Sequence, residues 1–410
     1  MRILNIHKYY WPRDGASKYA LQLGDLLRQQ GNEVVPFAMQ SPENLASRYD
    51  RFFVSNVDLH NPRRVSFLKK IQYAGRMFYS FEAKRKITAL LQENNIDVAH
   101  LHNIYHHISP SILPILKKRR IPIVMTLHDY KLLTPNYTLF HHSAVHEEDA
   151  RGWYWSCVKN KCLKNDRAQS ALATAEMIWH HKIMRYYERY VDHFIAPSQF
   201  MLDLCVKFGW PRAKFSYIPH PVEVPSGQRA VDGSYVAYAG RLSEEKGIEV
   251  LIQAAAKTPH IPYKIFGIGP DEDRLRAFVR DNAIHNITFE GFVTGEALQQ
   301  AIANARLLVV PSIWYENAPL SVLEPMVMGK VVIGSRIGGI PELLPEKLLC
   351  LAGDSVELAR VITHWFEAPA AARTAAGQEL KKQAKENHNS QVHVQRIVEL
   401  YNAVVSKTWK

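Results

Sequence analysis

Short apolar runs alternate with amphipathic segments along almost the whole chain. Apolar residues at Leu21, Leu23, Leu26 and Leu27 predict a helix over residues 16–30 that ends at Gly31. Buried strands are expected before and after it, at RILNIH (2–7), EVVPFAM (33–39), IDVAHLHN (96–103) and IPIVMTLHDY (121–130). This alternation predicts a parallel, Rossmann-like sheet. The first strand-to-helix turn has Gly15 but no G-x-G-x-x-G, so dinucleotide binding is not indicated.

The same pattern restarts after a proline-rich linker. SYIPHPVEVPSGQ (216–228) separates the first set of elements from SYVAYAGRL, a strand, and EKGIEVLIQAAAK, a helix. The last periodic segment, about 391–405, predicts a helix that crosses back to the first domain. We therefore predict an α/β protein with domains at 1–218 and 219–390 and a C-terminal helix within 391–410.

Length and composition narrow the class of protein. A chain of 410 residues suits two domains. It has no run of 18 apolar residues, its N-terminus does not resemble a signal peptide, and its four cysteines suggest no disulfide framework. These features predict a cytoplasmic protein.

Charge is unevenly divided. Residues 1–218 carry 31 Lys/Arg against 18 Asp/Glu, whereas residues 219–410 carry 20 against 21. The most basic piece is 61–93, where apolar helix positions are flanked by Arg63, Arg64, Lys69, Lys70, Arg76, Lys84, Arg85 and Lys86. Such a helix can lie on an anionic membrane, but a core-packed helix with a solvated charged face has the same pattern. No nucleic-acid recognition motif accompanies the positive charge, so nucleic acid is not an expected partner.

Residues 307–344 predict strand, loop, helix and strand, with two carboxylates eight residues apart. LLVVP and VVIGS are the strands, Pro319 suits the first turn of the helix and Gly329 its end. Glu316 lies in the loop and Glu324 on the helix. Ligands of parallel α/β sheets bind beyond the carboxyl ends of the strands, near helix N-termini that favour phosphate. Both acids can therefore face a ligand, although an exposed loop acid and a solvated helix acid are the plain alternative.

Three further groups of residues are candidates for chemistry. His128 ends a predicted strand and could donate to or accept from a sugar hydroxyl, or be a structural histidine. Arg241 and Lys246 flank a helix N-terminus and could clamp a diphosphate. Residues 130–170 form an irregular insertion in which a C-x4-C pair could be half a zinc site. The spacing is not standard, however, and no second pair follows. The candidate ligands are His141, His142, His146, Cys157 and Cys162.

The order of these pieces resembles the retaining GT-B glycosyltransferases of family 4. AGRLSEEKG, IFGIGP, EGFV, PSIWYENAPLSVLE and SRIGGIPELL follow one another in family order, and Gly15, LHDY and IPHPVE match in the first half. LHDYKLLTPNYTLF is similar to a bacterial subgroup that builds surface polysaccharides. That subgroup often has Cys-Pro where this chain has Thr134-Pro135, a departure that counts against zinc.

The resemblance implies a GT-B fold with two Rossmann-like domains facing a central cleft. It implies that Arg241 and Lys246 hold the donor diphosphate, that Glu324 binds ribose and that Glu316 and His128 meet the donor sugar. Other donor contacts would come from Gly15, Gly267, Gly269, Phe292, Val293, Asn317, Ala318, Pro319 and Leu320. No metal and no cofactor are implied, because the sugar nucleotide is a substrate.

The acceptor implied is a saccharide or a polyprenyl-diphosphate-linked saccharide, reached at the inner face of the membrane. The alternative is a non-catalytic partner protein that binds sugar nucleotides with the same fold. A GT-B phosphorylase or an epimerase is the nearest competing enzyme.

Overall fold

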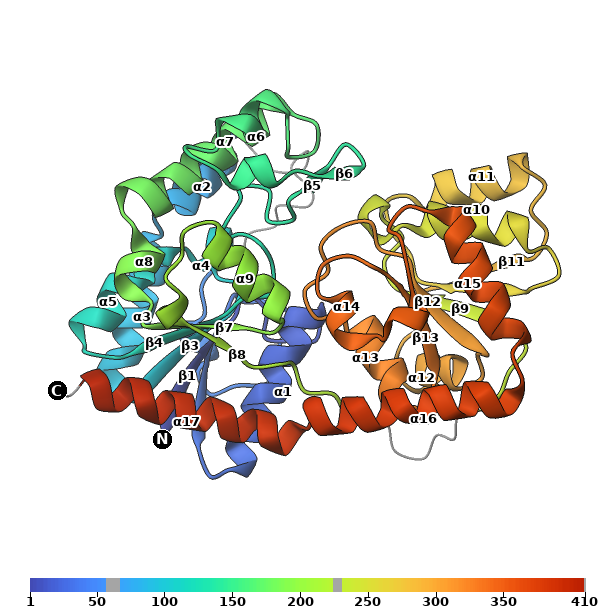
Figure 1. Ribbon diagram of the computed structural model, residues 1–410. Helices are drawn as coiled ribbons and strands as arrows, with labels where there is room; N and C mark the ends of the chain where they lie inside the picture. Colours follow the sequence, from blue (N-terminus) through green and yellow to red (C-terminus); the bar gives the residue numbers. More distant parts are fainter. Residues whose placement is uncertain (57–66, 224–230, 409–410) are drawn as a thin grey trace.

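The computed structural model describes residues 1–56, 67–223 and 231–408. It contains two six-stranded sheets, with strand orders β2-β1-β3-β4-β7-β8 and β11-β10-β9-β12-β13-β14 (Figure 1). Strands pair in parallel in both sheets. This confirms the predicted α/β architecture of two Rossmann-like units. The strands are β1 (Arg2–Ile6), β2 (Glu33–Phe37), β3 (Val98–Leu101), β4 (Ile123–Thr126), β7 (His193–Ala196), β8 (Phe215–Tyr217), β9 (Val236–Ala239), β10 (Tyr263–Phe266), β11 (Ile287–Gly291), β12 (Leu307–Val310), β13 (Val331–Ser335) and β14 (Leu349–Cys350).

Helices connect the strands of the first sheet. In α1 the N-cap Asp14 accepts from the Ser17 backbone N–H, and the Ser17 hydroxyl accepts from the Asp14 N–H, which forms a capping box. Leu23, Leu26 and Leu27 of this helix are buried as expected, whereas Leu21 is partly exposed. The helices of this half are α1 (Gly15–Gln29), α2 (Phe67–Phe78), α3 (Phe81–Glu93), α4 (Tyr105–Ile108), α5 (Leu113–Lys118), α6 (Trp155–Lys159), α7 (Arg167–Ile178), α8 (Tyr186–Tyr190) and α9 (Gln199–Lys207).

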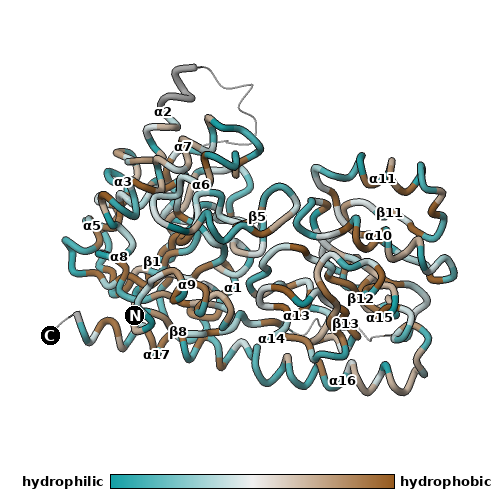
Figure 2. The backbone as a smooth tube through the Cα atoms, turned by 45° about the horizontal axis from the view of Figure 1, so that its top comes forward, coloured by the Kyte–Doolittle hydropathy of each residue, from teal (hydrophilic) through white to brown (hydrophobic). Residues whose placement is uncertain are grey.

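The second sheet has its own core. Hydrophobic residues gather along β12 and β13 (Figure 2), and these strands are completely buried. Their apolar side chains contact those of the covering helices, among them Leu323, Met326 and Val327 of α13. The helices of this half are α10 (Ile248–Lys257), α11 (Glu272–Asp281), α12 (Gly295–Ala303), α13 (Leu320–Val327), α14 (Ile340–Leu343), α15 (Ser355–Glu367) and α16 (Ala370–Asn387).

The last helix, α17 (Ser390–Thr408), returns to the first domain. It follows α16 across the underside of both units (Figure 1). Val394, Ile397 and Tyr401 are buried in one cluster with Ile3 of β1 and Tyr19 of α1. The predicted crossing helix is therefore confirmed.

The basic segment at 61–93 divides into two helices with different surroundings. Arg63 and Arg64 lie outside the described residues, and Lys69 and Lys70 lie on α2. Arg76 is not a surface cation, because its side chain is buried and pairs with Glu82 at 3.2 Å. Lys84 and Arg85 on α3 are exposed. Among the described residues, no helix is long and apolar enough to cross a membrane.

The insertion after β4 contains a β-hairpin and a bonded cysteine pair. The hairpin pairs β5 (Phe140–His141) with β6 (Ala144–Val145). Cys157 and Cys162 are joined as a disulfide, which the low cysteine content did not lead us to expect. Cys205 and Cys350 are free and buried.

Candidate active site

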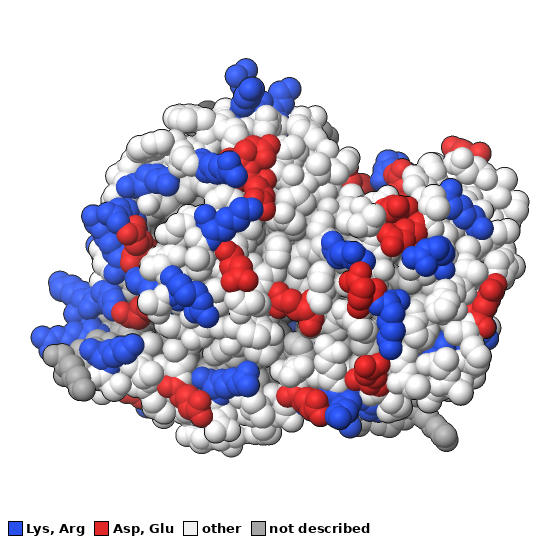
Figure 3. All heavy atoms as spheres, viewed as in Figure 1, with Lys and Arg blue, Asp and Glu red and all other residues white. Residues whose placement is uncertain are grey.

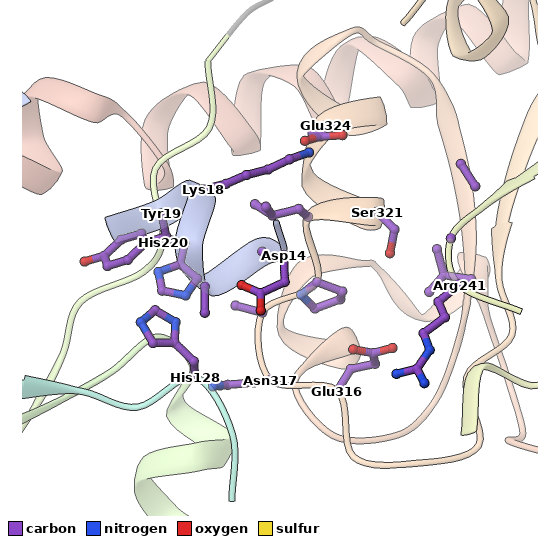
Figure 4. A pocket seen from close by; sticks show the side chains of 18 of the residues that line it. Asp14, Lys18, Tyr19, His128, His220, Arg241, Glu316, Asn317, Ser321 and Glu324 are labelled. Atoms are coloured by element: carbon purple, nitrogen blue, oxygen red, sulfur yellow. The ribbon is translucent and has the colours of Figure 1, made fainter. Parts of the chain in front are cut away.

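The carboxyl ends of the two sheets face a shared cavity of about 650 Å³. The first domain lines it with the N-terminus of α1, His128 and His220, and the second with Arg241, Lys246, the 312–320 segment and Glu324. Figure 4 shows these side chains converging from opposite walls. A cavity of this size can hold a ligand as large as a nucleotide.

Glu316 and Lys246 form an ion pair on the wall made by the second domain. Lys246 Nζ donates to Glu316 Oε1 at 2.7 Å, and the Ser312 hydroxyl donates to the same oxygen at 2.7 Å. Lys246 Nζ also lies 4.9 Å from the centre of the Trp314 ring. Burial alone would raise the pKa of Glu316, but the charge of Lys246 and these hydrogen bonds hold that pKa below its usual value. Glu316 is therefore a carboxylate at neutral pH.

Two glycines allow neighbouring backbone segments to pack closely around this ion pair. Gly247 has φ +67°, and a Cβ there would meet the Pro311 carbonyl oxygen at 2.0 Å. Gly338 has φ +59°, and a Cβ there would meet the backbone carbonyl oxygen of Glu316 at 2.4 Å. Larger residues at either position would displace the segment that carries Glu316.

The N-terminus of α13 opens toward the same cavity. Pro319 is its N-cap, one position before the first turn in which the sequence placed it, and Ser321 of that turn lines the cavity. The first backbone N–H groups of this eight-residue helix have no intrahelical partner and favour an anion. The exposed Arg241 also lines the cavity, where its guanidinium points toward Glu316 (Figure 4), and it has no ion-pair partner among the described residues. Arg241 and the helix N-terminus thus supply positive potential to one space, and Lys246 lines it in its ion pair with Glu316.

Glu324 lies farther along α13, where the first domain closes over it. Its partial burial raises its pKa, and the charge of Lys18 on α1 opposes that rise. Lys18 extends toward Glu324 in Figure 4. At the start of α1, a Cβ on Gly15 would meet only Leu320 Cδ1, at 3.9 Å. Gly15 and Glu324 therefore belong to opposite walls of one narrow part of the cavity.

His128 lies at the end of a hydrogen-bonded relay that fixes its protons. Asn5 Nδ2 donates to the Ala20 carbonyl at 2.8 Å, so Asn5 Oδ1 is the atom that faces His102 Nε2, at 3.0 Å. His102 Nε2 must then carry a proton. Burial lowers the pKa of His102 well below its usual value, so its Nδ1 is an acceptor.

The hydrogen bond between His102 and His128 fixes the proton of His128 as well. His102 Nδ1 lies 3.0 Å from His128 Nε2, which must donate. Burial also lowers the pKa of His128 well below its usual value. Nδ1 of His128 is therefore left as a hydrogen-bond acceptor at the cavity. Of the two hydroxyl contacts that the sequence left open, this proton arrangement fits acceptance, and the contacts of His128 with His102 and His220 also fit the structural alternative.

Four of the residues implied by the resemblance do not line the cavity. A Cβ on Gly267 would meet the Gly240 carbonyl oxygen at 1.8 Å, and one on Gly269 the Leu242 oxygen at 2.1 Å. These glycines thus support the turn that carries Arg241. Phe292 is 70 % exposed, and Val293 is packed against the core. Gly267 and Gly269 therefore lie beside the candidate Arg241, although they do not line the cavity themselves.

Contacts across the cleft hold the two domains together. Asn317 Nδ2 donates to the Leu127 carbonyl at 3.1 Å, and Asn317 Oδ1 accepts from the Ser198 hydroxyl at 2.7 Å. Glu342 accepts from the backbone N–H groups of Gln199 and Phe200, at the start of α9. The Asn317 side chain is therefore committed to the first domain, while the backbone of Asn317 to Leu320 remains along the cavity.

Several cavity residues were missed in the sequence. They are Asp14, Lys18, Tyr19, His220 and Ser321. His220 lies within the matching IPHPVE segment, and its ring stacks on that of His128 with centroids 5.4 Å apart. The capping pattern of Asp14 and Ser17 could have located the start of α1. Lys18 and Tyr19 carried no signal, because their place at the cavity depends on contacts between segments far apart in the sequence.

Comparison with known proteins agrees with this arrangement. The model described as Glycosyltransferase Family 4 matches residues 13–224, more than half of the chain. The chain belongs to glycosyltransferase family 4. A second model, described as Glycosyl transferases group 1, matches residues 223–388, so the two matched ranges meet in the segment between the sheets.

Individual relatives extend the family assignment. This glycosyltransferase is 26 % identical over 365 residues to an uncharacterized glycosyltransferase of Methanocaldococcus jannaschii, covering 85 % of this chain and 84 % of the relative. It is also 27 % identical over 158 residues to the colanic acid biosynthesis glycosyltransferase WcaL of Escherichia coli, covering 34 % of this chain and 38 % of that protein.

Solved structures show the same fold. Sucrose-phosphate synthase from Thermosynechococcus elongatus superposes with a TM-score of 0.72 at 18 % identity, over 99 % of this chain and all of the other. Anabaena HepE in complex with UDP superposes with a TM-score of 0.65 at 16 % identity, over 98 % of this chain and all of the other. These likenesses confirm the GT-B fold.

Proposed function

We propose that the protein moves a sugar from a nucleotide diphosphate sugar, UDP- or GDP-linked, to a saccharide or lipid-linked saccharide, with retention of anomeric configuration. The observation that carries this proposal is the convergence of Arg241, Lys246 and the N-terminus of α13 on one space. Anionic diphosphate is the ligand that such a space favours. Anabaena HepE, which shares the fold, was solved with UDP and with UDP-glucose.

The remaining cavity residues fit the other parts of such a donor. Glu324 is placed to accept from ribose hydroxyls beyond the diphosphate. Glu316 keeps its second oxygen for a sugar hydroxyl, because Lys246 and Ser312 both bind Oε1. His128 Nδ1 accepts a further hydroxyl from the opposite wall. Lys246 offsets the charge of Glu316, so the diphosphate does not meet an uncompensated carboxylate.

The proposed reaction takes place on one face of the donor sugar. The bond between the anomeric carbon and the leaving phosphate oxygen breaks, and the acceptor oxygen forms its bond from the same side. The leaving phosphate takes the proton of the acceptor hydroxyl. Negative charge grows on the diphosphate during this step, and the preorganised cations and helix N-terminus stabilise it. No metal and no cofactor take part in this scheme.

The acceptor is proposed to be a polyprenyl-diphosphate-linked saccharide presented at an anionic membrane. Phe81 at the start of α3 is 79 % exposed and lies beside the exposed Lys84 and Arg85. Lys and Arg are dense on the first domain in Figure 3, whereas both signs mix on the second. WcaL of Escherichia coli and AmsK of Erwinia amylovora are named for polysaccharide biosynthesis. This supports a role at the inner face of the membrane in making cell-surface polysaccharide.

Binding of the protein to vesicles tests the membrane contact. Reversing charge at Lys84 and Arg85 should weaken binding to anionic vesicles and leave binding to neutral vesicles unchanged. The same reversal at Lys381 and Lys382, on α16 of the second domain, is the control. Equal loss in both variants would contradict a contact through α3.

A thermal-shift panel tests the donor class. A nucleotide at 100 times its dissociation constant adds about 2.7 kcal/mol of stability. We expect UDP or GDP to raise the melting temperature and ADP and NAD to leave it unchanged. Release of nucleotide diphosphate in the presence of acceptor then separates an enzyme from the alternative, a sugar-nucleotide-binding partner protein. No shift with any nucleotide would contradict the proposed site.

A further inference from the structure

The insertion between β4 and α7 has little regular structure to hold its shape. Its elements are the β5–β6 hairpin, a 3-10 turn at Glu147–Ala150 and the five-residue α6. Most of the non-glycine residues with positive φ in the described chain lie between residues 137 and 165. A segment of this kind needs side-chain or ligand contacts to fix its path.

Three potential metal ligands meet at the centre of this insertion. A carboxylate oxygen of Asp149 and the Sγ atoms of Cys157 and Cys162 all lie within 4.8 Å of one another. Asp149 and Cys157 are completely buried, and Cys162 is 4 % exposed. It is the one group of three such side chains found in the described part of the chain, and it lies outside the donor cavity.

Two buried polar atoms at this place have no hydrogen-bond partner in the structure. Asp149 Oδ2 accepts from His141 Nε2 at 2.8 Å, but Asp149 Oδ1 is unpartnered. His146 Nδ1 lies 2.7 Å from Glu148 Oε1, but His146 Nε2 is unpartnered. A buried polar atom without a partner is unfavourable, so each of these atoms favours a bound ligand.

The hydrogen bond from His141 orients the Asp149 carboxylate and leaves its Oδ1 free as a ligand, as the outer partners of metal ligands commonly do. His146 stacks on His141, with ring centroids 3.8 Å apart, and so helps to hold it in place. A carboxylate and two cysteine thiolates supply three of the four ligands of tetrahedral zinc, and water can take the fourth position.

We propose that the reduced protein binds one Zn²⁺ through Asp149, Cys157 and Cys162. A dithiol reductant supplies two electrons and two protons to open the Cys157–Cys162 bond, and is itself oxidised to a disulfide. Each cysteine then loses its proton to solvent as its thiolate binds the ion. The disulfide is the metal-free, oxidised form of the same site. In the sequence Thr134-Pro135 counted against zinc without excluding it, and the burial of these three ligands favours it.

The site would act by positioning a neighbour, not in the reaction. Glu147, between His146 and Asp149, accepts from the Tyr315 hydroxyl at 2.9 Å. Tyr315 precedes Glu316, and the Ser143 hydroxyl also bonds Glu244 of the second domain. The ion would therefore fix the part of the insertion that contacts the Glu316 segment. This consequence rests on the proposed function, but metal binding itself does not.

Metal content of the full chain tests the proposal without an activity assay. The protein, purified with a phosphine reductant, is given excess Zn²⁺, dialysed and analysed by mass spectrometry for metals. We expect about one Zn²⁺ per chain, and Co²⁺ in its place should give thiolate-to-cobalt absorption. Cys157→Ser should lose the ion and His141→Ala should bind it at least 10-fold more weakly. His142→Ala and Cys350→Ser, matched controls outside the ligand set, should bind as the parent chain does.

Two results would overturn the proposal. One is the finding that the reduced parent protein, shown by circular dichroism to be folded, takes up no Zn²⁺ and gives no cobalt band. The other is zinc retained by both Cys157→Ser and His141→Ala. Zinc binding by a chain that transfers no sugar would contradict the proposed function and leave the metal site intact.

Discussion

Replacing Lys246 with methionine should destabilise the second domain in a way that depends on Glu316. Methionine keeps the length of the side chain but removes the one cation that, among the described residues, is bonded to this buried carboxylate. Removing one partner of a buried pair costs about 3–5 kcal/mol. Because the side chain of Lys246 is 25 % exposed, we expect a loss of about 3 kcal/mol at neutral pH.

The pH dependence of this loss has a definite sign. The native pKa of Glu316 is depressed, so its stabilising contribution is present above the unfolded-state value of about 4.3 and is lost as pH falls through the native pKa. In Lys246→Met the carboxylate lacks its cation and protonates more readily. The difference in unfolding free energy between variant and parent should therefore be largest at neutral pH and should narrow in acid.

A double-mutant cycle measures the coupling directly. Unfolding by guanidinium is followed by tryptophan fluorescence for the parent, Lys246→Met, Glu316→Gln and the double variant. The double variant should be more stable than Lys246→Met, with a coupling of about 1–3 kcal/mol. Equal stability of Lys246→Met and the parent at pH 7, or strictly additive effects, would refute the reasoning.

Three further predictions use other features of the cavity. Gly15→Ala should leave the melting temperature unchanged, because its Cβ meets only Leu320, but should weaken nucleotide-sugar binding in calorimetry. Gly338→Ala should lower the melting temperature, because φ is positive there and a Cβ would meet the Glu316 carbonyl oxygen. A lower melting temperature for Gly15→Ala than for Gly338→Ala would contradict both expectations. Asn5→Leu removes the acceptor that fixes the tautomer of His102, so both tautomers become accessible. Sugar transfer should slow about 10-fold, which corresponds to one lost hydrogen bond of about 1.4 kcal/mol, and the affinity for the nucleotide alone should stay unchanged in calorimetry. Glu342→Ala should release α9 from the second domain and raise the radius of gyration in X-ray scattering, whereas Glu346→Ala, also on the second domain, should not.

Periodicity and turn residues were enough to predict two parallel α/β units, and the resemblance to family 4 added their GT-B arrangement. Apolar strands that alternate with amphipathic helices are typical of parallel sheets. The proline-rich linker indicated that the chain forms two such sheets. The C-terminal helix was predicted from its pattern alone, and its burial against Ile3 and Tyr19 confirms where it packs. These features are local or nearly so, which is why the sequence reveals them.

The candidate site was predictable only where motifs carry it. Glu316, Glu324, Arg241 and Lys246 do line one cavity. The sequence did not show that Glu316 and Lys246 pair with each other, since that depends on a contact between residues 70 positions apart. Nor did it show that Gly267 and Gly269 pack against the backbone of the turn that carries Arg241.

Contacts between distant segments account for the other gaps. Arg76 was grouped with surface cations because helical spacing cannot show that Glu82 and the His107 carbonyl enclose it. The relay from Asn5 through His102 to His128 joins three strand ends, so no sequence window contains it. The unpartnered atoms of His146 and Asp149 likewise emerge only from three-dimensional burial.

Analysis of the reaction product tests the central claim most directly. The protein is incubated with the UDP- or GDP-sugar that stabilises it and with membrane-extracted lipid-linked acceptors, and released nucleotide diphosphate and the new linkage are measured by chromatography and proton NMR. We predict one nucleotide diphosphate released per sugar transferred, a product with the anomeric configuration of the donor, and loss of both in Glu324→Ala. Inverted configuration would contradict the proposed same-face reaction, and tight nucleotide-sugar binding without any transfer to the acceptors would contradict the assignment of the chain as an active transferase.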